Sequence, residues 1–294
     1  MSAGGSGEAD SSQHRWIFSK EQMQQAASIK EGMDEWSELQ YRQQATRFIQ
    51  TLADKLNQNL RDPRAKMTQL CVCASMIHMH RFYYFHTFMF FDYRDVSAAC
   101  LFLSGKSEEC PRKLEHVVRA WWQEKFPGVK LDNQHYQEAA QLIVTIENVV
   151  LQTIAFDLRI SLPHPVVLKA MHSIARGNRK ITEVVYFFST DVLCVTSWGI
   201  RYTAEAIAVA CIYIVCVWAD YKVEQLRSAA SSVRPRGVRA ASRHASSSLS
   251  RSRSPSCSSR RCGAEHAARA RVLVNLVERA GKRDVDMCGM PVTG

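Results

Sequence analysis

Two residues of opposite charge stand where helical hydrophobic stripes require an apolar side chain. Lys106 ends a stripe that begins at Val96, and Glu147 lies within a stripe that runs from Ala140 to Ile154. A charge among apolar neighbours is costly to bury unless it finds an opposite charge or reaches water. The pattern leaves two alternatives. The two side chains pair with each other or together serve a third partner, or each lies at a solvated helix edge.

The sequence carries no motif of a catalytic centre. It contains no Gly-rich phosphate loop, no Gly-x-Ser-x-Gly elbow and no kinase catalytic motif. Glu108 and Glu109 are adjacent carboxylates at a predicted helix end, where a solvated terminus is the usual explanation. His78 and His80 point about 200° apart on a helix, so they cannot share a metal ion. We therefore expect a protein that is not an enzyme and has no metal and no cofactor.

Five long helical segments must position these charges. Apolar residues recur at helical spacing in Ser37–Asn57, Met67–Phe91, the segment that follows Asp95, Lys113–Lys125 and Tyr136–Phe156. Asp95 is the predicted N-cap of the third helix. Gly105 within that helix predicts close helix packing or close approach of a partner.

A second and shorter helical series follows Pro163 and Pro165. It consists of Val166–Arg176, Ile181–Trp198 and Thr203–Asp220. The apolar run Ala206–Ala219 is shorter than the ~20 residues of a membrane span, so a buried core helix is the better interpretation. After Tyr221 the composition changes.

The last part of the chain is basic and rich in serine. Residues 226–294 carry 14 basic and 4 acidic residues and thus the whole net charge of +10. The segment Leu226–Cys262 holds 13 Ser and 9 Arg, which predicts disorder. Clustered arginines suit nuclear import or weak RNA contact through phosphate, although a solvated linker is an equal alternative. The candidates are Arg251, Arg253, Arg260 and Arg261.

The start of the chain is Gly/Ser-rich over residues 1–13 and is expected to be disordered, with no apolar run typical of a signal peptide. Trp16 and Phe18 follow directly. These aromatic side chains either fold back on their own domain or dock on a partner. The ten cysteines form no metal or disulfide framework, which favours free thiols in a reducing compartment.

Several stretches resemble the cyclin family, specifically its T and K branch. They are RWIFSKEQ at 15–22, YRQQA at 41–45, MHRF at 79–82, SGKSEECPRKLEHVVR from Ser104 and TIENVVLQTIAFDL from Thr145. The resemblance implies an all-α cyclin fold. Residues 14–157 would form a five-helix N-terminal cyclin box and 158–225 a partial second repeat. Residues 1–13 and the Arg/Ser-rich 226–294 would be disordered.

The resemblance also implies a function. Cyclins of this branch are regulatory subunits of transcriptional cyclin-dependent kinases, so a nuclear heterodimer is expected. The expected partner is cyclin-dependent kinase 9, in the manner of positive transcription elongation factor b, which phosphorylates the RNA polymerase II C-terminal repeat. The residues that match the family's kinase contacts are Phe102, Lys106, Glu109, Glu147 and Phe156, joined by Trp16 and Phe18. From the sequence alone, a core position explains Phe102 and Phe156 better than a partner contact does.

Two other functions remain open. A cyclin L-like adaptor for RNA processing would carry an Arg/Ser tail on a cyclin box and bind a different kinase. A helical transcription scaffold with the same fold and no kinase would not need Lys106 and Glu147 on one surface.

Overall fold

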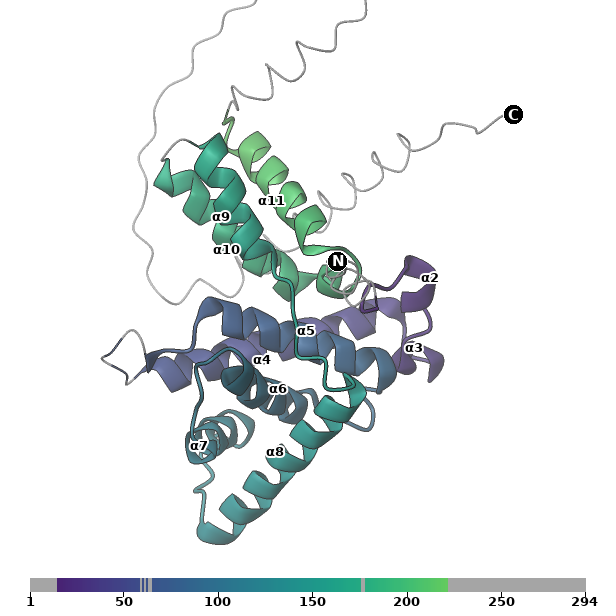
Figure 1. Ribbon diagram of the computed structural model, residues 1–294. Coiled ribbons are helices and arrows are strands. Elements are labelled where there is room, and N and C mark those ends of the chain that lie inside the picture. The colour runs from purple at the N-terminus through teal and green to yellow at the C-terminus, as the bar shows by residue number, and fades with distance from the viewer. Residues whose placement is uncertain (1–14, 59, 61, 63–64, 176–177, 222–294) are drawn as a thin grey trace, which may run out of the picture. The chain divides into compact units, whose positions relative to one another are not determined.

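The described part of the chain is helical throughout. The computed structural model describes residues 15–58, 60, 62, 65–175 and 178–221, and these residues form helices and turns without a strand (Figure 1). The segments predicted as disordered, 1–13 and 226–294, lie outside the described residues, as do the four tail arginines named above. The all-helical class predicted from periodicity is confirmed.

Five helices form the first bundle around one central helix. They are α4 (Glu35–Gln58), α5 (Gln69–Phe85), α6 (Tyr93–Ser107), α7 (Leu114–Lys125) and α8 (Asn133–Thr153). Helix α6 contacts all four of the others (Figure 1). Its buried face includes small residues such as Ala98 and Ala99, which allow the neighbouring helices to approach closely. Two short helices, α2 (Lys20–Met23) and α3 (Ala27–Lys30), precede the bundle.

The boundary between α5 and α6 differs from the sequence prediction. Helix α5 ends at Phe85 instead of Phe91, because His86 adopts extended backbone angles. Asp92, not Asp95, is the N-cap of α6, and its carboxylate accepts a hydrogen bond of 2.9 Å from the Arg94 amide. Asp95 is buried in the first turn, where it accepts a hydrogen bond from the Trp121 indole and pairs with Lys125. Asp95, the residue predicted as the cap, therefore forms a core ion pair between α6 and α7 instead.

Gly105 serves the internal packing of the chain. A Cβ atom there would lie 3.3 Å from the Cys110 carbonyl oxygen and 3.4 Å from the Met67 methyl carbon. The space beside Gly105 is filled by the connection between α6 and α7, so close packing is the alternative that the structure supports.

Three helices follow in the second repeat. They are α9 (Pro163–Ile174), α10 (Arg179–Val195) and α11 (Ala204–Trp218), with the short 3-10 helix η2 (Trp198–Ile200) before α11. Proline at the first position of α9 needs no hydrogen-bond acceptor there. The side chains of Asn178 and Thr203 cap α10 and α11.

Side chains of the first bundle form hydrogen bonds with the carbonyl groups at the C-terminal end of α10. The last carbonyl groups of a helix have no partner within the helix. Gln43 donates to the Val195 carbonyl at 2.8 Å and Thr46 to the Cys194 carbonyl at 2.9 Å, while a ring nitrogen of His80 lies 3.3 Å from the Leu193 carbonyl oxygen. The C-terminus of α10 is thus fixed on α4 and α5.

One face of α11 is uncovered by the described residues. Val209, Tyr213 and Val217 recur every four residues along it and are all exposed. In the first bundle, α7 and α8 cover the corresponding sides of α6, and the described part of the second repeat includes no equivalent helices. Among these helices, including α11, none is long and apolar enough to cross a membrane.

Candidate functional site

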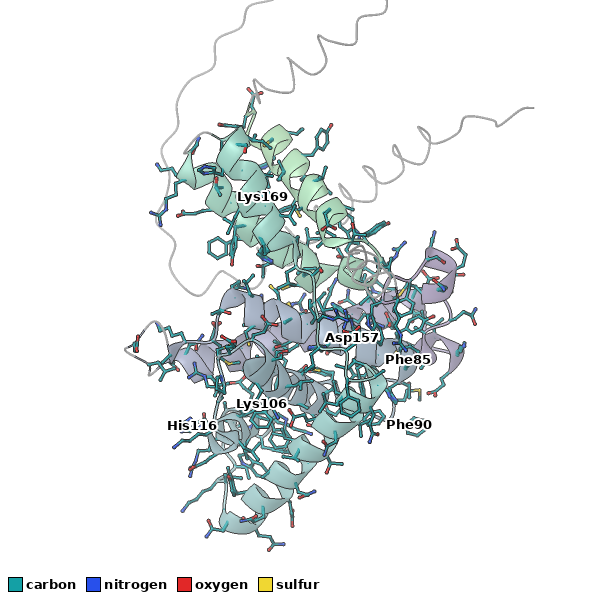
Figure 2. The ribbon with its side chains drawn as sticks, viewed as in Figure 1. Phe85, Phe90, Lys106, His116, Asp157 and Lys169 are labelled. Atoms are coloured by element: carbon teal, nitrogen blue, oxygen red, sulfur yellow. The ribbon has the colours of Figure 1, made fainter. Side chains whose placement is uncertain are left out.

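Lys106 near the end of α6 and Glu147 in α8 form an ion pair between their ammonium and carboxylate groups. The two side chains differ strongly in exposure, since Lys106 is 45% exposed and Glu147 only 6%. The flexible stem of lysine lets the ammonium reach water while the carboxylate stays between the helices. The pairing alternative raised by the sequence is the one present, and the pair opens on the outer surface (Figure 2).

Phe102 completes a cluster of three side chains. It lies one turn before Lys106 and is half-buried, with its ring centroid 4.3 Å from the Lys106 ammonium. A cation over an aromatic face is attracted by about 0.5–1 kcal/mol at such a site. On the inner side, burial and then the nearby Glu147 raise the pKa of the Cys100 thiol, which therefore stays protonated. The buried Glu147 carboxylate is thus the anionic partner on the inner side of the cluster, and the Lys106 ammonium lies on the outer side.

Glu109 and Phe156 lie at the C-terminal ends of the same two helices. Glu109 is exposed with a φ of 56°, and the Cys110 amide donates back to the Gly105 carbonyl at 3.0 Å. At the end of α8, Ala155 and Phe156 have φ values of 51° and 58°, and the Phe156 amide donates to the Leu151 carbonyl at 2.9 Å. Both ends are Schellman-type turns, which usually place glycine in the left-handed position.

The left-handed residues in these turns have a strained backbone. A left-handed residue with a Cβ atom costs about 1–2 kcal/mol relative to the ordinary helical conformation. The strain at α8 projects Phe156 outward with 68% of its side chain exposed. Strain that persists beside an exposed aromatic is typical of a binding surface. We call Phe102, Lys106, Glu109, Glu147 and Phe156 the ion-pair face.

Trp16 and Phe18 are buried in their own domain. The Trp16 indole donates to the Asp157 carboxylate at 3.0 Å, and the Arg81 guanidinium lies 4.7 Å from the Trp16 ring centroid. Phe18 stacks on Tyr84 with the ring centroids 3.7 Å apart. The fold-back alternative is therefore the one that the structure favours. The prediction that these two rings themselves contact a partner is not supported by their burial, and a positioning role fits them better.

The segment fixed by Trp16 is the connection between the two repeats. Burial raises the pKa of the Asp157 carboxyl, but the Trp16 hydrogen bond, the backbone amide of Arg159 and the Arg81 charge together lower it below its ordinary value. Arg81 also donates to the carbonyls of Asp157 and Arg159 at 3.2 and 3.3 Å. The ionised Asp157 thus anchors the N-terminal segment beside the exposed Phe156. Sequence reasoning missed this anchor, for which the only local signal was an aspartate directly after the fifth helix.

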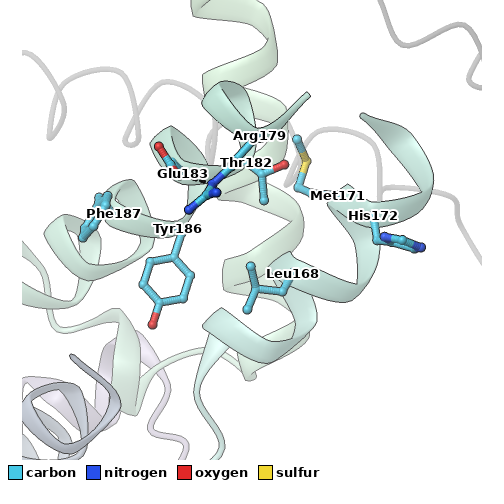
Figure 3. A pocket seen from close by; sticks show the side chains of 8 residues that line it. All are labelled: Leu168, Met171, His172, Arg179, Thr182, Glu183, Tyr186 and Phe187. Atoms are coloured by element: carbon cyan, nitrogen blue, oxygen red, sulfur yellow. Dashed lines mark hydrogen bonds and ion pairs between the residues drawn. The ribbon is translucent and has the colours of Figure 1, made fainter. Parts of the chain in front are cut away.

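The described residues also line two hollows, and the second of them borders the ion-pair face through Ser107, Glu108 and Asp157. One of about 480 Å³ lies between α9 and α10, where Leu168, Tyr186 and Phe187 face an open space (Figure 3). Its Arg179 and Glu183 are paired with each other at 2.9 Å. The other, of about 640 Å³, lies beside the connection between the repeats and includes Trp16 and Tyr202. Within the described ranges, no group of three potential metal-ligating side chains is found.

Comparison with known proteins identifies two matching families. Residues 17–159 match the family described as "Cyclin, N-terminal domain", and residues 162–231 match "Cyclin-T2-like, C-terminal domain". Cyclin-T1.1 of Caenorhabditis elegans is 45% identical over 214 residues, which cover 72% of this chain and 46% of that protein. Cyclin-T1 of Homo sapiens is 33% identical over 222 residues, covering 74% of this chain and 29% of that protein. The chain therefore matches less than half the length of these relatives.

Solved structures of similar fold are kinase complexes from yeast. The RNA Pol II CTD kinase CTDK-1 complex contains a chain that aligns with a TM-score of 0.60 at 20% identity, covering 70% of this chain and 63% of that one. A chain of the TFIIK (Kin28/Ccl1/Tfb3) complex aligns with a TM-score of 0.54 at 16% identity, covering 74% of this chain and 87% of that one. At these identities the likeness concerns the fold.

Proposed function

Because the chain belongs to the cyclin family, in its cyclin T branch, we propose that it is the regulatory subunit of a transcriptional cyclin-dependent kinase. The proposed kinase is cyclin-dependent kinase 9, and the proposed substrate is the C-terminal repeat of RNA polymerase II. The chain itself contributes no catalytic group. It acts in the nucleus, as a heterodimer with the kinase.

The observation that supports this proposal most is the exposed end of the Lys106–Glu147 pair. A kinase becomes active when its mobile helix is held inward, so that its catalytic Lys–Glu pair forms. A regulator must therefore present a rigid surface with an apolar centre and a few oriented charges. Phe102 and Phe156 supply apolar area, and Lys106 supplies a fixed cation for charge-assisted hydrogen bonds.

The two charged residues have different roles in this proposal. Glu147 is buried, so its carboxylate orients the Lys106 ammonium and has little surface for a partner. Lys106 makes the contact. Glu109, exposed in the turn that follows α6, supplies a negative charge that fixes the register of the kinase helix.

Recovery of the bound kinase from nuclear extract tests the proposal. The chain is used as bait beside two single variants, Lys106→Glu on the ion-pair face and Lys169→Glu, an exposed lysine on α9 (Figure 2). Mass spectrometry should recover cyclin-dependent kinase 9 with the unmodified chain and with Lys169→Glu, and lose it with Lys106→Glu. Recovery of a splicing-associated kinase instead would support the cyclin L-like alternative. Recovery of no kinase with any bait would contradict the proposal.

A further inference from the structure

A tight turn between α5 and α6 displays two strongly exposed apolar side chains. Phe90 is 81% exposed and Met89 is 69% exposed, both within Thr87–Phe91. Phe85, the last residue of α5, is also exposed. Contiguous apolar patches on a folded domain often mark interaction surfaces, and these three side chains come from one short stretch of the chain. We call Phe85, Met89 and Phe90 the turn patch.

The turn that carries the patch is held firmly on both sides of its tip. Phe88 is buried and stacks on Tyr83 with centroids 3.6 Å apart, and its amide donates to the Ser28 hydroxyl at 3.0 Å. The Tyr83 hydroxyl donates to the Phe91 carbonyl at 3.1 Å. Met89 and Phe90 are thus displayed from a backbone that is already ordered. Anchors of this kind lose little conformational entropy on binding.

The turn patch adjoins the end of α8 that carries Phe156. The His86 ring nitrogen lies 2.8 Å from the Thr153 hydroxyl, which joins the start of the turn to the last residue of α8. The Phe85 ring is 6.3 Å from the Trp16 ring, and Trp16 bonds to Asp157, the neighbour of Phe156. Figure 2 shows Phe85 and Phe90 at the same end of α8 as Asp157.

The area of a stable interface extends beyond the ion-pair face. A specific heterodimer buries roughly 800 Å² on each partner and involves about 20–30 residues on each side. The five residues of the ion-pair face are too few to supply this area. Along α8, the six residue steps from Glu147 to Thr153 span about 9 Å, and Thr153 contacts His86 at the start of the turn. A round patch of the required area has a radius of roughly 16 Å, so a patch centred at Glu147 reaches the start of the turn.

We propose that the turn patch is the apolar outer part of the kinase-binding surface, where Met89 and Phe90 insert against an uncharged, apolar region of the kinase. The inference rests on the proposed function and names a second anchor for the same partner. Lys106 and Glu109 orient the kinase, and the turn patch adds apolar burial at the far end of α8. Loss of the patch therefore weakens binding without disturbing the Lys106–Glu147 pair.

Affinity measurements with recombinant cyclin-dependent kinase 9 test this inference. The full chain is compared with Phe90→Asp and Met89→Asp, with Phe187→Asp on α10 as a control of the same type and 58% exposure, and with Lys106→Glu. Calorimetry should give a Kd about tenfold or more higher for Phe90→Asp, because truncated or charged anchors cost this much at interfaces. Met89→Asp should weaken binding to a similar extent. Phe187→Asp should change Kd less than twofold, because Phe187 lies outside the proposed interface.

The outcomes separate this inference from the proposed function. If Phe90→Asp and Met89→Asp bind normally while Lys106→Glu does not, the turn-patch inference is overturned and the proposed function stands. If Lys106→Glu also binds normally, the turn-patch inference and the role given to Lys106 are both overturned, whereas the proposed function fails only if the unmodified chain does not bind the kinase. If Phe90→Asp leaves kinase affinity unchanged but converts a self-associated chain to monomer in sedimentation, the patch binds a second copy, and the inference is overturned.

Discussion

Lys106 and Glu147 form one ion pair, yet the carboxylate is buried between α6 and α8 while the ammonium faces outward over the Phe102 ring. Removal of either charge breaks the pair, but only removal of Lys106 changes the charge seen from outside. A buried carboxylate that positions an exposed cation explains why a charge belongs on each apolar stripe. The following predictions test this arrangement and the fold that supports it.

Replacement of Glu109 by glycine should separate stability from binding. Glycine accepts the left-handed conformation without strain, so Glu109→Gly should raise the free energy of unfolding by about 1 kcal/mol. The lost carboxylate should at the same time weaken kinase binding. Urea unfolding and calorimetry measure the two effects.

The chain offers a matched control for this variant. Asp220 has a φ of 47° after α11, and the Tyr221 amide closes the same turn on the Cys216 carbonyl at 2.8 Å. Asp220→Gly should therefore give a similar gain in stability and leave kinase affinity unchanged. Equal losses of affinity in both variants would contradict the role given to Glu109.

Gly199 should not tolerate a side chain. A Cβ atom there would lie 2.1 Å from the Ile77 Cδ1 atom, where η2 packs on α5. Overpacking of this kind costs about 1–3 kcal/mol, so Gly199→Ala should lower the free energy of unfolding by that amount. The second change Ile77→Val removes the Cδ1 atom and should recover most of the loss. Independent, additive effects in the double variant would show that the two residues do not clash.

His78 should make the fold sensitive to acid. It is fully buried, and neither ring nitrogen has a hydrogen-bond partner within the described residues. Burial, with the nearby Arg81 charge, lowers the pKa of His78 to about 3. Because the folded state resists protonation, stability is retained above about pH 6.5 and falls by up to about 1.4 kcal/mol per pH unit below it.

His78→Leu removes this penalty and should flatten the pH dependence. We compare the free energy of unfolding of the variant with that of the original chain. This difference should be more favourable to the variant at pH 5 than at pH 8. Urea unfolding at the two pH values measures the difference. If the difference in free energy of unfolding between the two proteins stays constant from pH 8 to pH 5, His78 is protonated in the folded state.

Much of the fold and part of the site follow from the sequence. Helical periodicity predicts the all-α class. The charges at Lys106 and Glu147 raise pairing as one of two alternatives, and the structure contains the pair. Helical spacing also places Phe102 one turn before Lys106. Each of these inferences rests on residues close together on one helix or on a charge that requires a partner.

Other features depend on contacts that local patterns do not encode. The turn after Phe85 is rich in phenylalanine and has no glycine or proline, so its composition resembles that of the helix before it. Asp95 was the predicted cap of α6, but Asp92 caps the helix and Asp95 pairs with Lys125 from α7, a contact between two helices. The fold-back of Trp16 depends on Asp157, which is 141 residues away in the chain.

The central claim is that the outward cation of the ion pair docks the kinase. The most direct test measures the Kd for cyclin-dependent kinase 9 of Lys106→Glu and of the exchanged pair Lys106→Glu/Glu147→Lys, with helix content followed by circular dichroism. The exchange restores attraction between the two side chains but turns the outer charge negative. We predict that both variants keep their helix content and lose binding by about a hundredfold, which is within the range for a single interface hot spot. Unchanged affinity in both folded variants would contradict the claim.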